Sequence, residues 1–274
     1  MSQQAQLRMA IAGGGGRMGR ALLETAGSTP NVKICGVLEH AASPLLGQDA
    51  GSLSVHAAGV VISADAEATL AQADLLIDFT RPEATLRHLA ACRKHGLNLV
   101  IGTTGFSRQE KEQIEAASKE IAIVFAPNMS VGVNVMLKLI ALATKTLHEQ
   151  YDIEIIETHH KMKVDAPSGT ALKMGEVAAE MMGKPLDEIA VFERHGANGK
   201  TGERKPGTIG FSAIRGGDII GDHTVMFAGV GERIEISHKS SSRTNYAEGA
   251  LRAAVFLADK RSGLYDMADV LGLK

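Results

Sequence analysis

Tryptophan is absent from this chain of 274 residues, and aromatic residues make up only 4% of it. Cysteine is nearly as scarce, with Cys35 and Cys92 as its two representatives. They form no C-x-x-C pair, so neither a metal site nor a disulfide framework is expected, and a reducing cytoplasm is the expected location. The polar residues 1–7 lack the charged-then-apolar pattern of a secretory signal.

Long hydrophobic runs and a strong charge of one sign are missing as well. Crossing a membrane takes ~18 uncharged apolar residues, and the best candidate, residues 131–147, is interrupted by Lys138 and Lys145. The 29 basic and 31 acidic residues leave a net charge of −2. Proteins that bind polyanions usually carry a basic face. We therefore expect neither a membrane nor a nucleic acid among the partners.

Glycine is the residue in excess, at 30 of 274, where soluble proteins average ~7%. The absence of a Gly-X-Y period and the presence of only 7 prolines exclude a collagen-like or low-complexity chain. Five glycines fall within residues 13–19 and ten within residues 196–231. The length itself predicts one large domain or two modest ones.

The first half of the chain alternates short apolar runs with helical patterns. Apolar runs without internal alternation, separated by helices, predict a parallel sheet covered on both faces, which is a doubly wound α/β domain. The expected strands are residues 7–12, 32–38, 60–62, 75–79, 98–101 and 121–125. The expected helices are residues 17–26, 82–95, with Pro82 in its first turn and Gly96 after its end, and 107–119.

The pattern changes beyond residue 130. Polar and apolar residues alternate over residues 152–158, as in a sheet with one wet face. Glycine-rich turns and a polar loop at 196–205 join further strand-like runs. We expect this loop to be solvated; a mobile segment and a subunit contact are the alternatives. We expect a second, α+β domain with a mixed or antiparallel sheet, built from helices at 131–148 and 168–182 and strands at 208–214, 223–228 and 233–237. A last helix is expected at 246–257, without a strong prediction for the tail.

A glycine-rich turn follows the first strand. Gly14, Gly16 and Gly19 satisfy G-x-G-x-x-G, between a strand and a helix. Such a turn lets the backbone approach a pyrophosphate, which rests on the helix N-terminus. Glu39 ends the second strand 20 residues after Gly19, where a carboxylate accepts hydrogen bonds from the ribose hydroxyls. The alternative is a tight turn without a ligand.

Two further loops, at residues 102–105 and 126–129, follow later strands. In an open parallel sheet, ligands bind outside the carboxyl ends of the strands. Both loops are therefore expected on the dinucleotide side of the sheet, although each is also compatible with an ordinary turn.

A histidine–lysine cluster occupies residues 157–171, E-T-H-H-K-M-K-V-D-A-P-S-G-T-A. Histidine exchanges protons near neutral pH, lysine holds a carboxylate or a developing negative charge, and the helix start at Gly169 and Thr170 is a ready anion site. A small anionic substrate next to a nicotinamide would use all three. Adjacent strand residues point to opposite faces, so at most one histidine is expected to be catalytic.

Two alternatives concern the same stretch. Lys161 and Lys163 could instead form a solvated face, which is the usual position of lysine side chains. A metal site at the two histidines is not expected, because they lack the H-E-x-x-H spacing.

Together these segments resemble the 4-hydroxy-tetrahydrodipicolinate reductase family, formerly called dihydrodipicolinate reductases, of the diaminopimelate route to lysine. The similarity runs along nearly the whole chain, and H-H-K-M-K-V-D-A-P-S-G-T-A is its most specific part. The other matching stretches are A-G-G-G-G-R-M-G-R, D-F-T-R-P-E, V-I-G-T-T-G-F, N-M-S-V-G-V-N-V, T-G-E-R-K-P-G-T-I-G-F, R-G-G-D-I-I-G-D-H and S-H-K-S-S-S-R.

The resemblance implies the role of each matching residue. His159 matches the proton donor, Lys163 the second catalytic residue, and His160, Gly169 and Thr170 the substrate-binding positions. The implied contacts of NADH or NADPH are Gly13, Gly14, Gly15, Gly16, Arg17, Met18, Glu39, Gly102, Thr103, Thr104, Ala126, Pro127, Asn128 and Met129.

The resemblance also implies an architecture and a reaction. It implies a Rossmann-type dinucleotide domain from residues 1–129 with 240–274, and a substrate and oligomerisation domain from residues 130–239 that assembles a homotetramer. A cyclic dicarboxylate would receive a hydride at C4, lose its 4-hydroxyl as water and be protonated at the adjacent carbon.

His40 departs from the family, in which many members have arginine. Arginine there would pair with the 2′-phosphate of NADPH, whereas a largely neutral histidine beside Glu39 favours a free hydroxyl. We therefore expect NADH to be used at least as well as NADPH. Two rival functions stay open: another two-domain dehydrogenase, such as an aspartate-semialdehyde dehydrogenase with a cysteine nucleophile, and a protein that senses NAD(H) without turnover.

Overall fold

The computed structural model describes residues 6–196 and 200–274. The chain divides into two compact units, Met1–Val131 with Arg243–Lys274, and Gly132–Ser242. The first unit is therefore discontinuous in sequence: the chain leaves it, forms the second unit, and returns.

The first unit contains a seven-stranded parallel sheet in the order β12-β6-β5-β4-β1-β2-β3. Six of these strands follow the 3-2-1-4-5-6 order of a doubly wound dinucleotide-binding sheet, which confirms the predicted fold class. The strands are β1 (Leu7–Ala12), β2 (Val32–Leu38), β3 (Ile62–Ser63), β4 (Leu75–Asp78), β5 (Asn98–Ile101), β6 (Ala122–Phe125) and β12 (Gly263–Tyr265).

Both faces of this sheet are covered. In β1, Met9 and Ile11 pack on one side with helices α1 (Arg17–Ala26), α8 (Thr244–Leu257) and α9 (Met267–Leu271). Ala10 and Ala12 pack on the other side with α2 (Ala66–Leu70), α3 (Pro82–His95) and α4 (Arg108–Ala117). Because alternate side chains enter two separate cores, residues 9–12 of this strand form an unbroken apolar run.

Strand register brings several loops to one edge of the first sheet. Asp78 pairs with Ala12 on one side and with Ile101 on the other, and Ile101 pairs with Phe125. The carboxyl ends of β1, β4, β5 and β6 therefore lie side by side. Residues that follow these strands share the edge at which ligands of doubly wound sheets bind.

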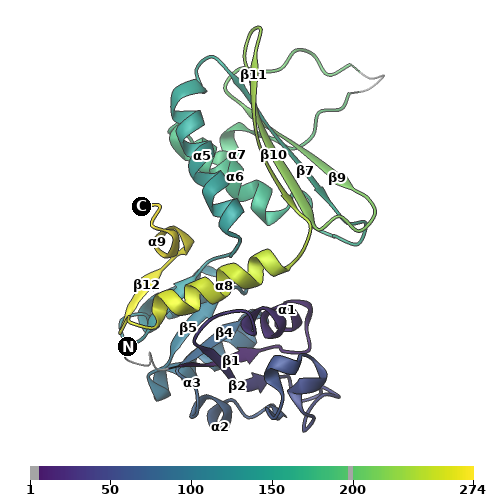
Figure 1. Ribbon diagram of the computed structural model, residues 1–274. Helices are drawn as coiled ribbons and strands as arrows, with labels where there is room; N and C mark the ends of the chain where they lie inside the picture. The colour runs from purple at the N-terminus through teal and green to yellow at the C-terminus, as the bar shows by residue number, and fades with distance from the viewer. Residues whose placement is uncertain (1–5, 197–199) are drawn as a thin grey trace. The chain divides into compact units, whose positions relative to one another are not determined.

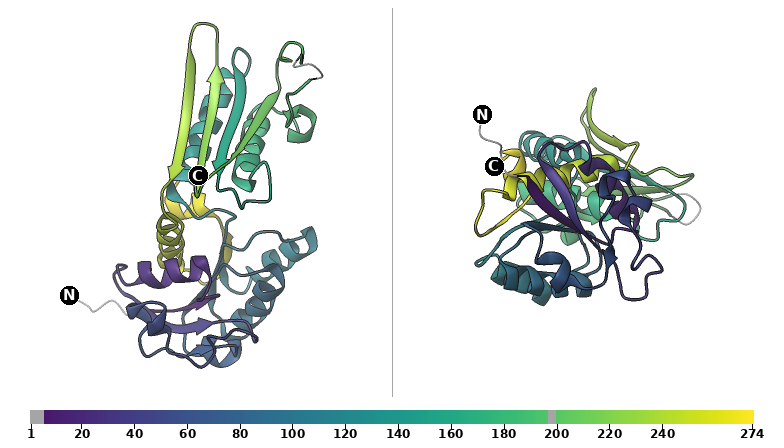
Figure 2. Two further views of the ribbon diagram at one scale, coloured as in Figure 1. Left: turned by 90° about the vertical axis from the view of Figure 1, so that its right-hand side faces the viewer. Right: turned by 60° about the horizontal axis from the view of Figure 1, so that its bottom comes forward.

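The second unit contains a mixed sheet in the order β11-β10-β7-β9-β8. Its central strand β7 (Asp152–His159) is antiparallel to β10 (Gly221–Ala228) and parallel to β9 (Ile209–Arg215); the edge strands are β8 (Ala190–Val191) and β11 (Arg233–Ser240). Figure 2 shows β10 and β11 as one long hairpin. Helices α5 (Val131–Leu147), α6 (Gly169–Met181) and α7 (Leu186–Ile189) cover one face (Figure 1). The predicted second α+β domain is thus confirmed. Of the two sheet types that the sequence allows, mixed and antiparallel, the structure contains the mixed one.

Helix ends follow local sequence signals. Pro82 occupies the first turn of α3, and Gly96 ends it in the left-handed conformation with φ +67°. Ser107 and Glu110 form a reciprocal capping box at the start of α4.

Short elements are the main difference from the sequence prediction. The strand expected at 60–62 retains only Ile62, within β3, while Val61 forms an isolated antiparallel bridge with Asp49. These pieces are too short to show a hydrophobic period, so tertiary pairing creates them. Also missed were α2, α7, α9, β8, β12 and two 3-10 helices, Ala50–Ser52 and Val55–Ala57.

The expectation of a solvated loop at 196–205 is wrong at Arg204. This side chain is only 16% exposed, because it pairs with Asp152 and Glu154 of β7 and donates to the carbonyls of Ile153 and Thr208. Residues 197–199 of the loop lie outside the described residues.

Candidate active site

The glycine turn after β1 places an uncapped helix start at the sheet edge. Gly13, with φ +72°, and Gly14 donate to the carbonyl of Leu38 at 2.8 and 3.3 Å. Gly16 precedes α1 and supplies no side-chain cap. The first-turn N–H groups of α1 are therefore suited to an anion such as a pyrophosphate.

Close backbone contacts require two of these glycines. A Cβ atom at Gly19 would lie 2.1 Å from the carbonyl oxygen of Gly13, and one at Gly14 would lie 2.3 Å from Cγ1 of Val37. A tight turn alone explains these two positions. It does not explain the uncapped helix start, which fits the dinucleotide interpretation better.

Glu39 lies directly against the glycine turn. Its carboxylate, with a side chain only 9% exposed, accepts from the N–H of Gly15 at 2.8 Å and from that of His40 at 3.2 Å. The His40 ring is 70% exposed, with Nε2 3.9 Å from Oε2 of Glu39. The carboxylate thus has the position expected of a ribose ligand, with a largely solvated imidazole beside it.

The other predicted cofactor loops divide into buried and outward-facing residues. Thr103, Ala126 and Met129 are buried, and α8 approaches so closely that a Cβ at Gly249 would lie within 2 Å of the Met129 carbonyl oxygen. Thr104 and Pro127 are exposed, and Asn128 is half-buried. The buried residues therefore hold the loops in place, while Thr104 and Pro127 lie at the surface of this edge.

A polar network after β4 was not assigned from sequence. Asp78 is fully buried, and its Oδ1 accepts from the N–H and hydroxyl of Thr80 at 2.8 and 2.6 Å. Its Oδ2 lies 2.7 Å from Nδ1 of His88. The stretch D-F-T-R-P-E contributed to the family resemblance, yet nothing in its pattern indicated that the aspartate side chain organises the loop.

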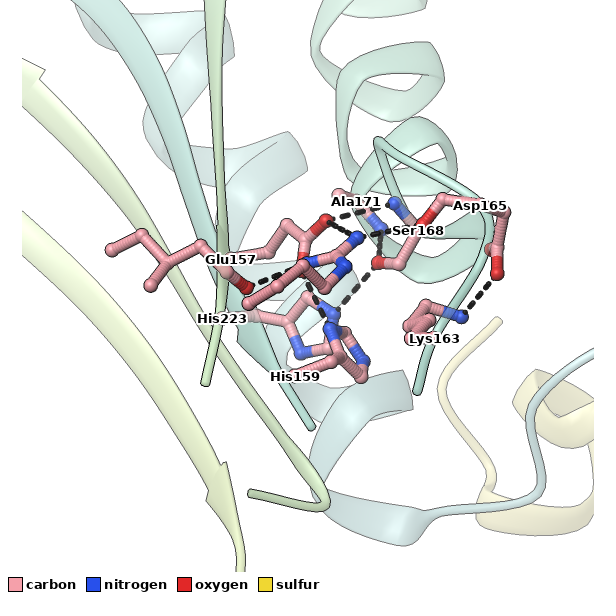
Figure 3. A network of polar contacts seen from close by, with 9 residues as sticks. Glu157, His159, Lys163, Asp165, Ser168, Ala171 and His223 are labelled. Carbon is pink, nitrogen blue, oxygen red and sulfur yellow. Dashed lines mark hydrogen bonds and ion pairs between the residues drawn. The ribbon is translucent and has the colours of Figure 1, made fainter. Parts of the chain in front are cut away.

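The predicted catalytic histidine lies at the carboxyl end of β7. Alternating burial along this strand puts Glu157 and His159 on the same buried face, and His160 just beyond the strand end. Nδ1 of His159 lies 2.5 Å from Oε2 of Glu157 (Figure 3). Arg215, the register partner of His159 on β9, donates to both oxygens of the same carboxylate at 2.8 and 2.7 Å.

Burial and charge oppose each other in this network. Burial alone would raise the pKa of Glu157, but hydrogen bonds from Arg215 and His159 hold that pKa below its ordinary value. For His159, burial lowers the pKa, and the carboxylate of Glu157 offsets this only in part. At neutral pH the network therefore holds an ionised glutamate, a charged arginine and a largely neutral histidine.

A second histidine, His223 on β10, lies beside the first. The two rings meet edge to face with centroids 5.1 Å apart, and Nε2 of His223 is 3.1 Å from Oγ of Ser168. Burial, with the neighbouring His159 as the next cause, lowers the pKa of His223 to about 4. His223 is therefore neutral at pH 7.

Lys163 forms an ion pair with Asp165 in the loop after β7. Its Nζ lies 2.8 Å from Oδ1 of Asp165, and its side chain is 21% exposed, whereas Lys161 is exposed. Figure 3 shows this pair on the loop that leads into α6. The interpretation of both lysines as a solvated face therefore fails for Lys163.

Two of the predicted substrate-binding residues, Gly169 and Thr170, begin α6, and the third, His160, follows the end of β7. Ser168 caps this helix by accepting from the N–H of Ala171 at 3.2 Å. Gly169 is exposed and His160 half-buried, and Nδ1 of His160 is buried without a partner in the described part of the chain. Thr170, the second residue of α6, is half-buried.

Four residues of this site were not assigned a role from the sequence. Three of them lie on the strands β7, β9 and β10, and the fourth precedes α6. They are Glu157, Ser168, Arg215 and His223. The one signal in the local sequence is that Glu157 stands two residues before His159. Among the described residues, no three potential metal ligands converge, and no helix is long and apolar enough to cross a membrane.

A doubly wound sheet with a glycine turn, joined to a unit in which a buried histidine contacts a buried glutamate, defines a two-domain NAD(P)-dependent oxidoreductase. Residues 7–129 match the family model described as dihydrodipicolinate reductase, N-terminus, and residues 132–271 match its C-terminus counterpart. The chain belongs to the dihydrodipicolinate reductase family.

Curated relatives span the same length. Proteins named 4-hydroxy-tetrahydrodipicolinate reductase from Nitrosospira multiformis and Cupriavidus pinatubonensis are 59% and 62% identical over 268 residues. Each match covers 98% of this chain, and 98% and 100% of the respective relatives. A solved dipicolinate-bound dihydrodipicolinate reductase from Paenisporosarcina sp. TG-14 is 27% identical, with a TM-score of 0.76 over 96% of this chain and 98% of its own.

Proposed function

We propose that this protein is an NAD(P)H-dependent 4-hydroxy-tetrahydrodipicolinate reductase in lysine and diaminopimelate biosynthesis. The observation that carries the proposal is His159, held by a buried glutamate at the end of β7, in a chain about 60% identical to proteins of that name. The substrate ring would accept a hydride at C4, lose its 4-hydroxyl as water, and gain a proton at the adjacent carbon.

The cofactor, NADH or NADPH, would be held at the carboxyl edge of the first sheet. The uncapped start of α1 and the Glu39 carboxylate fit a pyrophosphate and a ribose respectively. When bound, the nicotinamide supplies the hydride. The residues proposed to contact the cofactor are Gly13–Met18, Glu39, His40, Gly102–Thr104 and Ala126–Met129.

The second unit would supply the proton and hold the dicarboxylate. His159 acts as general acid: burial favours its neutral form, and the adjacent Glu157 carboxylate stabilises the protonated form that delivers the proton. Lys163 and the N–H groups at Gly169 and Thr170 bind substrate carboxylates. His160 contributes a further contact, through a ring whose Nδ1 has no partner in the described residues.

A cysteine nucleophile, as in a semialdehyde dehydrogenase, has little support. Burial raises the pKa of both thiols, Cys35 on β2 and Cys92 in α3. A raised pKa makes a thiol a poor nucleophile at neutral pH. The NAD(H)-sensing alternative would not require the Glu157–His159 network.

Assembly and location complete the proposal. The face of the second sheet opposite α5 and α6 presents Ile156, Ile214 and Met226, each at least partly exposed within the described chain. Covering such a face between copies supports a homotetramer. Two free thiols fit the reducing cytoplasm.

A coupled assay tests the proposed function. The substrate is generated from pyruvate and aspartate semialdehyde by the corresponding synthase, and NADH absorbance is followed on addition of this protein. We expect oxidation of NADH that depends on both the synthase and this protein. Reaction with aspartate semialdehyde alone would indicate the rival dehydrogenase, and NADH binding without turnover would indicate a sensor.

A further inference from the structure

Glu157 is a buried carboxylate whose hydrogen-bonding capacity is filled. Its side chain is 1% exposed. Oε1 accepts from Nη2 of Arg215 at 2.7 Å and from the N–H of Ser168 at 3.1 Å, and Oε2 accepts from Nη1 of Arg215 at 2.8 Å. The fourth contact is Nδ1 of His159 at 2.5 Å. An ionised carboxylate accepts about four hydrogen bonds and donates none.

This arrangement determines the tautomer of His159. Because Glu157 can only accept, Nδ1 of His159 must carry the hydrogen that lies between them. In the neutral ring Nε2 is then unprotonated, and in the protonated ring Nε2–H is the proton that faces away from the carboxylate. Arg215 keeps the carboxylate ionised, since it donates to both oxygens and lowers the pKa of Glu157.

Gly221 leaves room beside Nε2 of His159. A Cβ atom at this first residue of β10 would lie 3.0 Å from Nε2 and 3.4 Å from Cδ2 of His159. The backbone of Gly221 is not in the left-handed region, so any residue could adopt it. The lack of a side chain is therefore useful here for space next to the histidine, not for conformation.

Of the charged and titratable groups that face His159, Glu157 is the one that favours the protonated form of the histidine. These groups are Glu157 on β7, Arg215 on β9, His223 on β10 and Lys163 in the loop after β7. Lys163 and Arg215 lower the pKa of His159, and His223 is a neutral neighbour at pH 7, whereas Glu157 raises it. Loss of the Glu157 charge should thus lower the pKa of His159.

We propose that Glu157 is a positioning residue of the reduction: with Arg215 it holds His159 as the Nδ1–H tautomer, and Gly221 clears the space at Nε2, the atom that delivers the proton to the substrate. The delivery step rests on the proposed function. In that step the Nε2–H bond breaks, its proton forms the new C–H bond, and the electron pair stays on Nε2.

Glu157→Gln tests the proposal, because a side-chain amide cannot accept at both ends. Its NH₂ group would face Nδ1 of His159 and favour the opposite tautomer. We expect kcat to fall about 10–100-fold with an unchanged KM for NADH. The alkaline limb of the kcat profile, where the acid loses its proton, should move to lower pH. Loss of rate that is uniform across pH would contradict the positioning role.

Glu154→Gln is the matched control. Glu154 also lies on β7 and pairs with an arginine, Arg204, but it belongs to the opposite face of the strand. It should leave the kcat profile unchanged. If Glu154→Gln shifted the profile as much as Glu157→Gln, the effect would belong to the strand and not to the Glu157–His159 contact.

Histidine ¹⁵N NMR of the wild-type protein, with the His159 signals assigned from His159→Gln, tests the tautomer without a variant of Glu157. Above the pKa of His159 we expect a protonated Nδ1 and a bare Nε2. A protonated Nε2 in the neutral ring would overturn the inference, even if Glu157→Gln failed to fold. If NMR showed the expected tautomer but the coupled assay showed no turnover, the proposed function would be contradicted and the tautomer inference would stand.

Gly221→Ala tests the space at Nε2. We expect a lower kcat with the tautomer of His159 unchanged, since the methyl group meets the ring without touching Glu157. Wild-type kcat in this variant would overturn the role given to Gly221.

Discussion

The two units build their candidate sites from different materials. At the edge of the first sheet the binding surface is backbone: Gly13–Gly16, an uncapped helix start and loops that follow neighbouring strands. In the second unit, the site is a set of side chains from three strands: the buried Glu157, His159 and His223, and the partly buried Arg215. A backbone site depends on close approach and tolerates little added volume, whereas a side-chain site depends on charge and protonation.

The largest expected effect of breaking the side-chain site comes from His159→Gln. Without a proton donor, kcat should fall by ~10²–10⁴-fold while the far-UV circular dichroism and NADH affinity stay the same. His195→Gln is the control, because His195 is 81% exposed and outside the network. Turnover close to wild type in His159→Gln would remove the acid from the mechanism.

His223 should make the stability of the protein pH-dependent. Its folded pKa of about 4 lies below the ordinary value near 6.5, so between these values the unfolded chain binds more protons. Stability is therefore lost as pH falls from 6.5 through 4, by about 3 kcal/mol. Urea unfolding at pH 7 and pH 4 should show His223→Gln losing about 3 kcal/mol less than wild type. Equal losses would show that the burial of His223 has no such cost.

Gly19→Ala tests the backbone site by volume alone. The new methyl group would lie 2.1 Å from the Gly13 carbonyl oxygen and 2.6 Å from Cα of Gly14. We expect unfolding to become easier by about 1–3 kcal/mol and NADH fluorescence titrations to show weaker binding. Gly216→Ala, whose Cβ would meet nothing within 4 Å, should leave both unchanged. Wild-type NADH affinity in Gly19→Ala would argue against a tight cofactor turn.

The smallest expected effect concerns cofactor choice at His40. We expect wild-type kcat/KM for NADH to equal or exceed that for NADPH, and His40→Arg to raise the NADPH value several-fold through pairing with the 2′-phosphate. A tenfold wild-type preference for NADPH, which is about 1.4 kcal/mol, would contradict this.

Much of the fold could be predicted because its signals are local. The apolar runs of β1 and β5, the first-turn proline and terminal glycine of α3 and the glycine turn at 13–19 all lie within one element or at its end. Short elements such as β12 and α9 could not be predicted, since β12 exists through its pairing with β6. Arg204 shows the same limit, because its partners lie about 50 residues away on β7.

The sequence by itself determined the doubly wound class, the glycine turn, Glu39 and the histidine–lysine stretch, because each depends on residues close together in the chain. The tertiary structure alone decided which groups surround His159. Glu157 is two residues away, but Arg215 and His223 reach the site through the register of β9 and β10 with β7. Strand register depends on the packing of the whole sheet, so the charge balance around the histidine could not be read from any one segment.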